Sequence, residues 1–223
     1  SGVTRLIAAG LRAGGYRVLG NVTGSAAKWI EPDGTERAIP RHGLPNIREL
    51  IRTVKEASRC RADALVCECM ALQPELQQFS ERRLVQSHIG VITNVRHDHE
   101  EIMGPDLPTI AASLARTAPM NGLLVITPET AALLGGGIID RSSLRQTDGS
   151  QVSAQELASF PFAVEAENVA IALKVCELAR VPRPQALAAM QASQPDSGNQ
   201  TVRELPLPGA GSLRFVDALA AND

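Results

Sequence analysis

Three short apolar runs recur along the chain, and segments with helical periodicity fill the intervals between them. The runs are residues 64–70, 89–92 and 123–126, and each has the length and composition of a strand buried in a sheet. Strands that alternate with helices indicate parallel pairing, because a crossover helix carries the chain back before the next strand begins. The sequence therefore predicts an α/β fold, in which a doubly wound, mainly parallel sheet has helices on both faces.

The flanking segments extend this pattern. Helical spacing of apolar residues over 3–11 ends at Gly14 and Gly15, and a strand is predicted at 17–22. Residues 23–46, which include Pro32, Gly34, Pro40 and Gly43, are predicted to be a long loop, and a long loop indicates binding. Further helices are predicted at about 45–60, 74–85 and 107–118, and from 167 and 182; further strands are predicted at 138–140 and 213–217.

Composition narrows the classes of function. The 223 residues are 44% hydrophobic and 21% charged, as in an ordinary globular domain. Aromatic residues make up only 3% and the net charge is −2, so neither a base-stacking platform nor electrostatic attraction to nucleic acid is expected. The four cysteines lie in apolar or helical settings, which suits reduced thiols in the cytoplasm.

A polar cluster follows the strand predicted at 89–92. Residues 97–101 contain two histidines and three carboxylates. The carboxyl ends of strands in open α/β sheets are where ligands bind, because the loops there vary while the sheet holds them in place. We expect this loop to take part in the chemistry. The alternative is a charged loop that only faces solvent.

Glu68 lies among apolar residues in the strand predicted at 64–70. A buried, unpaired carboxylate is costly, so a positive group should face it. That group is either an arginine or lysine, or a divalent cation shared with the region of His97 and His99. Carboxylate oxygens and one imidazole suit Mg²⁺ or Mn²⁺. A zinc site of Cys67, Cys69 and the two histidines remains an alternative, but strand alternation would exclude Glu68 from it.

Three runs carry a family resemblance: residues 68–71, residues 89–95 with Asp98, His99 and 103–105 behind them, and residues 220–223. They resemble the ligase subunits of poly-γ-glutamate synthases from bacterial capsules, in the Mur ligase superfamily, and the resemblance extends over nearly the whole chain. It implies that residues 1–217 form a central ATP-binding domain of the P-loop NTPase type, and that 218–223 begin a hinge to a C-terminal domain. Ser1 would end a phosphate-binding loop whose strand, glycines and lysine precede this sequence.

The resemblance also assigns site residues. Glu68 and His99 would be the catalytic residues that hold Mg²⁺, with the Ser1 hydroxyl as a further metal ligand. Asn168 would contact the adenine of ATP, Arg203 its phosphates, and Asp217 would be the acid near the hinge. From the residues alone, Asn168 could cap its helix, Arg203 could be a surface charge and Asp217 a loop acid.

Two positions depart from the family pattern. Many Mur ligases carry a carbamylated lysine on the helix after the Asp-His loop, but residues 111–116 contain no lysine. Either Arg116 replaces part of that charge or the second metal ion is held differently. His97 stands where a carboxylate is expected, so we assign it no direct role.

The activity implied is that of an ATP-dependent amide ligase. It would form γ-glutamyl bonds between glutamate units through an acyl phosphate, and the present chain alone would be inactive. Its partners would be ATP, glutamate or poly-γ-glutamate, and the membrane subunits of a synthase at the inner face of the cell membrane; a homo-oligomer is also compatible. A non-catalytic nucleotide-binding module and a zinc-dependent hydrolase remain alternatives.

Residues 25–46 contain the cations proposed to bind the substrate. Lys28 and Arg41, together with Arg37 and His42, form a set suited to carboxylates through charge-assisted hydrogen bonds. The alternative is a solvated, charged surface.

Overall fold

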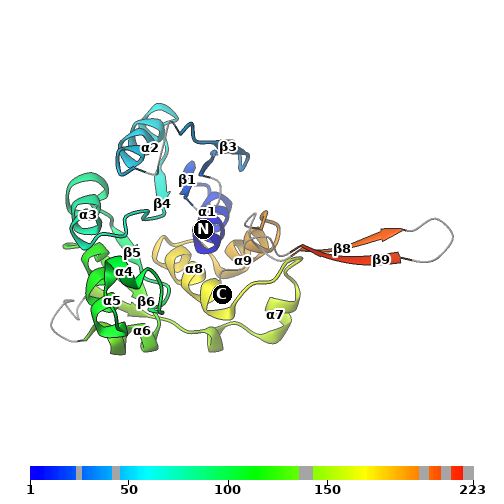
Figure 1. Cartoon of the computed structure of the whole chain (residues 1–223). Helices are drawn as coiled ribbons and strands as arrows, with labels where there is room; N and C mark the ends of the chain where they lie inside the picture. The colour runs from blue at the N-terminus through cyan, green and yellow to red at the C-terminus, as the bar shows by residue number, and fades with distance from the viewer. Residues whose placement is uncertain (24–26, 42–45, 136–142, 196–200, 207–211, 218–223) are drawn as a thin grey trace.

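A computed structural model describes residues 1–23, 27–41, 46–135, 143–195, 201–206 and 212–217 of the chain (Figure 1). The helices are α1 (Gly2–Ala13), α2 (Arg48–Arg59), α3 (Pro74–Phe79), the π-helix η1 (Ser80–Val85), α4 (Glu100–Met103), α5 (Leu107–Leu114), η2 (Ala115–Thr117), α6 (Pro128–Leu134), η4 (Gly149–Gln151), α7 (Ala154–Ala158), α8 (Ala166–Leu178) and α9 (Arg183–Gln191). The strands are β1 (Val18–Val22), β2 (Lys28–Ile30), β3 (Glu36–Ala38), β4 (Ala64–Cys67), β5 (Ile89–Val91), β6 (Leu123–Ile126), β7 (Leu144–Gln146), β8 (Thr201–Pro206) and β9 (Ser212–Asp217).

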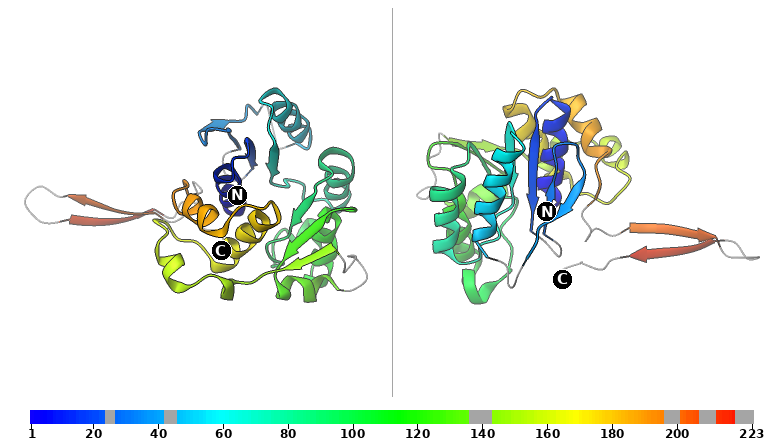
Figure 2. Two further views of the ribbon diagram at one scale, coloured as in Figure 1. Left: turned by 180° about the vertical axis from the view of Figure 1, so that it is seen from behind. Right: turned by 90° about the horizontal axis from the view of Figure 1, so that it is seen from above.

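The described strands form three sheets. One has the order β3-β2-β1-β4, in which β1 and β4 are parallel while β2 and β3 form an antiparallel extension. The second, β5-β6-β7, is entirely parallel. The antiparallel hairpin of β8 and β9 extends away from the other elements in every view (Figures 1 and 2).

Successive side chains of the strands point to opposite faces, and each face has its own core. Val18 and Val22 of β1 pack with residues of α1, α8 and α9, whereas Leu19 between them packs against Trp29 and against Ala57 of α2. The same alternation occurs in β6, where Val125 joins the first core and its neighbours face α5 and α6. Helices thus cover both faces of the sheets, and the predicted fold class is confirmed.

Helix α1 positions the candidate site. Leu6, Ile7 and Leu11 are buried on its inner face. Gly10 allows close packing, because a Cβ there would lie 2.5 Å from Sγ of Cys176 in α8 and 2.9 Å from Cε of Met190 in α9. Gly15, with φ of +89°, then turns the chain towards β1. Helix α1 is therefore packed closely against α8 and α9.

Three sequence predictions need correction. The loop predicted over 23–46 contains β2 and β3; each is only three residues long and is defined by pairing with its neighbour, which periodicity cannot detect. β4 ends at Cys67, so Glu68 lies just beyond the strand and its side chain is 25% exposed, instead of buried within the strand. β7 and α6 were not predicted. The strand predicted at 138–140 lies outside the described residues.

Candidate active site

Glu68 is the centre of a compact set of hydrogen bonds. Its Oε1 accepts from the amino group of Ser1 at 3.1 Å, and its Oε2 accepts from the Ser1 hydroxyl at 2.9 Å and from the Thr23 amide at 2.7 Å. The carboxylate therefore joins the first residue before α1 to the residues that follow β1 and β4. In the described part of the chain, the partners of the Glu68 carboxylate are the Ser1 nitrogen and hydroxyl and the Thr23 amide, and not the arginine or lysine considered from the sequence.

The amino ends of α1 and α8 meet at this edge of the sheet. Gly2 and Asn168 line one cavity together, and Ser1, Asn168 and Asn94 line another. Helix amino ends carry a partial positive charge and unpaired N–H groups, which favours binding of an anion such as phosphate. Because α1 and α8 have 12 and 13 residues, both are long enough for this effect.

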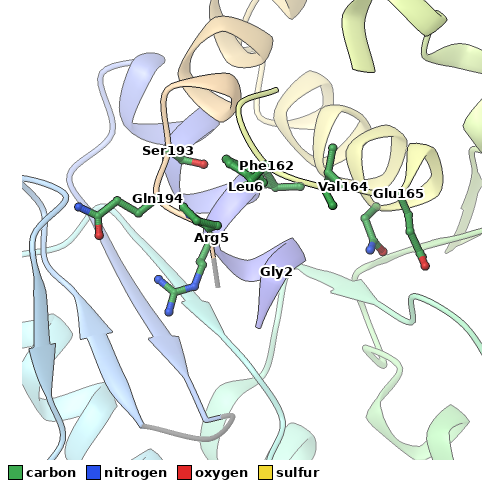
Figure 3. Close-up of a pocket in the computed structure, with 11 residues that line it drawn as sticks. Gly2, Arg5, Leu6, Phe162, Val164, Glu165, Ser193 and Gln194 are labelled. Carbon is green, nitrogen blue, oxygen red and sulfur yellow. The ribbon is translucent and has the colours of Figure 1, made fainter. Parts of the chain in front are cut away.

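A cavity of about 340 Å³ opens between these helices and the end of α9 (Figure 3). Leu6, Phe162 and Val164 give it an apolar wall, and Ser193 and Gln194 enter it from the segment after α9. Arg5, on the floor of the cavity, forms an ion pair with Glu36 of β3. A flat apolar ligand group with polar edges fits a cavity of this lining.

Asn168 lies where three cavities meet. The residue that caps α8 is Glu165, so Asn168 is in the first turn and the capping alternative is wrong. Within the described part of the chain, its side-chain amide has no hydrogen-bond partner. It is thus available to a ligand, which agrees with the role that the resemblance implies.

His99 is placed differently from Glu68. It begins α4 in the left-handed conformation, with φ of +49°, and its ring lies 3.6 Å from Asp98 and 3.7 Å from Glu101. His97 instead contacts Glu100, with Nδ1 2.6 Å from Oε1. The predicted turn after Asp98 is confirmed, and the two rings have separate partners. Among the described residues, no group of three or more histidine, cysteine, aspartate or glutamate side chains is arranged to hold a metal ion.

The zinc alternative is not favoured. Among the described residues, Cys67, Cys69, His97 and His99 do not come together as a group that could hold a metal ion. Arg116, considered as a substitute for a carbamylated lysine, donates to Gln78 of α3 at 3.3 Å. The Arg116 guanidinium is therefore bound to α3.

The described cations among those predicted to bind substrate are paired with carboxylates of the β2–β3 segment and of α2. Lys28 lies 2.9 Å from Glu36, and Nε of Arg41 lies 3.0 Å from both carboxylate oxygens of Glu49. Arg37 contacts Glu31 and Glu56 and stacks on Trp29, and His42 is outside the described residues. A role in substrate binding stays a prediction for Lys28 and Arg41.

Arg203 and Asp217 belong to the β8–β9 hairpin. Arg203 is opposite Phe215 in the ladder, and Asp217 is opposite Thr201. This hairpin projects from the body of the fold (Figure 2), so the structure does not bring these two residues to Glu68, and their assignments stay predictions. Thr23 is the contact that sequence reasoning missed, although a polar residue directly after a predicted strand was a usable signal.

Comparison with solved structures defines the class of fold. The chain matches "FPGS-AMPPCP complex" with a TM-score of 0.58 at 14% identity, covering 86% of this chain and 61% of that one. It matches "E.coli FolC in complex with ADP, without folate substrate" with a TM-score of 0.58 at 16% identity, covering 96% and 58%. The fold is therefore that of these FPGS and FolC chains.

Two curated proteins are similar over the whole of this chain. It is 33% identical to "Capsule biosynthesis protein CapB" of Bacillus anthracis over 227 residues, and 34% identical to "PGA synthase CapB" of Bacillus subtilis (strain 168) over 229 residues. These matches confirm the resemblance inferred from the sequence. The chain spans 49% and 58% of their lengths. No protein-family model matches it.

In the described part of the chain, no helix is both long and apolar enough to span a membrane.

Proposed function

We propose that residues 1–217 form the ATP-binding domain of an ATP-dependent amide ligase that makes γ-glutamyl bonds in poly-γ-glutamate synthesis. One observation carries the proposal: Ser1, Glu68 and Asn168 converge where the amino ends of α1 and α8 meet. The similarity to a PGA synthase supports the substrate class, and the fold shared with FPGS bound to the ATP analogue AMPPCP supports a nucleotide ligand.

The donor set at Ser1 and Glu68 fits Mg²⁺. The Ser1 hydroxyl oxygen and a carboxylate oxygen of Glu68 lie 2.9 Å apart, and both are oxygen ligands of the kind that Mg²⁺ prefers. The Glu68 side chain is 25% exposed, so it is largely shielded from water. These two side chains would hold the ion, which neutralises phosphate charge when bound. His99 is proposed as a further ligand only on the basis of the resemblance.

The remaining residues of the site would bind and orient the nucleotide. The first-turn amides of α1 would face the phosphates, because their N–H groups have no partner within the helix. The apolar cavity between Leu6 and Phe162 would take the base, and Asn168 at its mouth can both donate to and accept from the base edge.

In the reaction proposed, a γ-carboxylate of glutamate takes the terminal phosphoryl group of ATP and releases ADP. The amine of the next glutamate then attacks the acyl carbon, forms the amide and releases phosphate and a proton. Such a sequence needs positioning and charge stabilisation but no covalent protein nucleophile. Lys28 and Arg41 would reach the acceptor carboxylates only if they leave their present partners.

The test is ATP-dependent phosphate release by the longer protein, with and without glutamate, together with mass spectrometry of the products. We expect release that depends on glutamate and a γ-linked product that grows by one residue at a time. Nucleotide binding without an amide product would favour a non-catalytic module. A rate of phosphate release that is the same with and without glutamate would contradict the proposed substrate.

We further propose that the longer protein works beside membrane subunits at the inner face of the cell membrane, as part of a synthase. The support is the resemblance alone. Fractionation of cells should find the longer protein with the membrane, and removal of the partner subunits should release it.

A further inference from the structure

Helix α2 carries its acidic and basic side chains on opposite sides. Its two glutamates are largely buried against the body of the fold, Glu49 with 4% of its surface exposed and Glu56 with 13% of its side chain exposed. No carboxylate is among the exposed residues of this helix, which are Arg48, Ile51, Arg52, Val54, Lys55, Ser58 and Arg59. The outward side of α2 is therefore positively charged.

The basic residues of α2 form a single row, here called the cationic stripe. Its members are Arg48, Arg52, Lys55 and Arg59, which are separated by four, three and four residues. This spacing places them along one side of the helix. Successive members are about one helical turn apart, and the row covers roughly 16 Å of the helix axis. α2 lies at the outside of the fold (Figure 1), so a long ligand can approach the stripe.

Most of the cationic stripe has no acidic partner. Among the described residues, the ion pairs of α2 are those of Glu49 with Arg41 and of Glu56 with Arg37 and Arg59.

Three members of the stripe are left without a carboxylate in that part of the chain: Arg48, Arg52 and Lys55. Arg52 donates instead to the carbonyl of Pro40 at 2.9 Å. Like charges one turn apart on a helix repel one another, so an anionic ligand would relieve this repulsion.

The cationic stripe begins next to the candidate active site. Glu49, the neighbour of Arg48, lines a cavity of about 120 Å³ together with Glu68. Arg41, predicted to bind the acceptor, donates to the same Glu49 through Nε at 3.0 Å. Because α2 connects the parallel strands β1 and β4, it runs from this edge of the sheet back towards the opposite edge. The stripe therefore leads away from Glu68.

A chain of carboxylates fits this row of cations. Arginine binds carboxylates through paired N–H groups, and three members of the stripe are arginines. An extended α-linked chain advances at most about 3.6 Å per residue. A γ linkage adds two carbon atoms to each unit, which brings the spacing of the free carboxylates closer to the pitch of a helix, about 5.4 Å.

An anionic membrane surface fits the stripe less well. A helix that lies on a membrane buries a broad apolar face with large side chains such as Trp, Phe and Leu. The exposed large apolar residues of α2 are Ile51 and Val54, at 40% and 38%. The charges of this helix are therefore better matched than its apolar residues are.

We propose that the cationic stripe binds the free carboxylates of a poly-γ-glutamate chain whose end lies at the active site. The inference rests on the proposed function and adds to it a binding site outside the place of the reaction. Units of the chain that are remote from the reacting end lie along α2. A long acceptor is therefore held more tightly than a short one.

Kinetics of the longer protein with acceptors of two lengths test the stripe. Arg48→Gln combined with Lys55→Gln removes two of its charges. We expect the KM for a γ-linked chain of about ten glutamate units to rise about fivefold, because each exposed ion pair contributes only modestly. The KM for a γ-linked dimer and the KM for ATP should stay unchanged. Salt should weaken the preference for the long acceptor, because these charges are exposed.

The matched control combines Arg145→Gln with Arg180→Gln. It removes the same number of charges from exposed arginines of β7 and of the turn after α8. All three KM values should stay unchanged in this variant.

Binding of the ten-unit chain, measured by titration without ATP, separates this inference from the proposed function. Equal binding by the Arg48/Lys55 variant and the control, with amide formation intact, would overturn the stripe and leave the proposed function standing. Absence of an amide product with either acceptor would overturn the proposed function, and weaker binding of the chain by the Arg48/Lys55 variant would still support the stripe. If that variant instead binds the chain normally but loses binding to phosphatidylglycerol vesicles, the stripe contacts a membrane and the proposal is wrong.

Discussion

The Ser1 hydroxyl donates to Oε2 of Glu68 at 2.9 Å, although the two residues are 67 positions apart. The contact links the start of α1 to the end of β4, and the Thr23 amide on the same oxygen adds the end of β1. The start of α1 and the ends of β1 and β4 therefore meet at one carboxylate.

Glu68→Gln in the longer protein is expected to lower glutamate-dependent phosphate release by about 100-fold or more, because an amide cannot supply the charge that a cation at the phosphates needs. The thermal midpoint should change by only a few degrees. Glu156→Gln is the matched control: its side chain is 27% exposed, close to the 25% of Glu68, and it pairs with Arg183 outside the cavities near Glu68. It should lower stability but leave the rate per folded molecule unchanged. Near-normal release by Glu68→Gln would make Glu68 a structural group.

Asn168→Ala is expected to raise the KM for ATP by about tenfold, with a smaller effect on kcat, because a hydrogen-bonding partner of the base is lost. The preference for ATP over GTP should fall as well. Asn46→Ala is the control, since Asn46 accepts from the Arg48 amide at the start of α2 and lies outside these cavities. An unchanged KM and unchanged base preference would remove Asn168 from the nucleotide site.

The periodicity of the sequence predicted the helices and strands that are long or apolar. It missed short strands that exist only because they pair with an adjacent strand. Leu123–Ile126 is predicted as a strand from its residues alone, whereas Leu144–Gln146 is mostly exposed and is a strand only because it pairs with β6. The proximity of Ser1 and Glu68 depends on tertiary packing, so only the family resemblance anticipated it. The sequences of β4 and β5 do not indicate that these two strands belong to different sheets.

Acid should weaken the packing of α7. Hydrogen bonds from the Ser153 amide and from Arg183 lower the pKa of Glu156 below its ordinary value of 4.5. A lowered pKa in the folded state contributes stability above the ordinary value, and this is lost as the pH falls through the folded pKa. Glu156→Gln should therefore show a smaller fall in thermal midpoint between about pH 5 and pH 3 than the unaltered chain. Glu177→Gln, at an exposed pair with Lys174, should leave the fall unchanged.

Gly10→Ala is expected to destabilise the fold by about 1–3 kcal/mol, since the new methyl group would overlap Cys176 and Met190. Chemical denaturation should show a lower midpoint at an unchanged slope. Gly2→Ala is the control within the same helix, because nothing lies within 4 Å of a Cβ there. Equal stability of the two variants would show that α1 can move away from α8 and α9 at little cost.

The last prediction distinguishes a role of the His99 imidazole as a metal ligand from a role of the His99 backbone in forming the turn. His99 holds a left-handed conformation, which costs about 1 kcal/mol in residues other than glycine. If the imidazole is a metal ligand, His99→Ala and His99→Gly should both weaken the dependence of activity on Mg²⁺ by about tenfold or more. His97→Ala, which removes a ring that faces Glu100 instead, should not. If His99 serves only to form the turn, His99→Gly should keep full activity, because glycine adopts this conformation without strain. Titration of activity with Mg²⁺ in the three variants of the longer protein distinguishes the outcomes, and a stronger effect at His97 would show that the metal lies on the other side of Asp98.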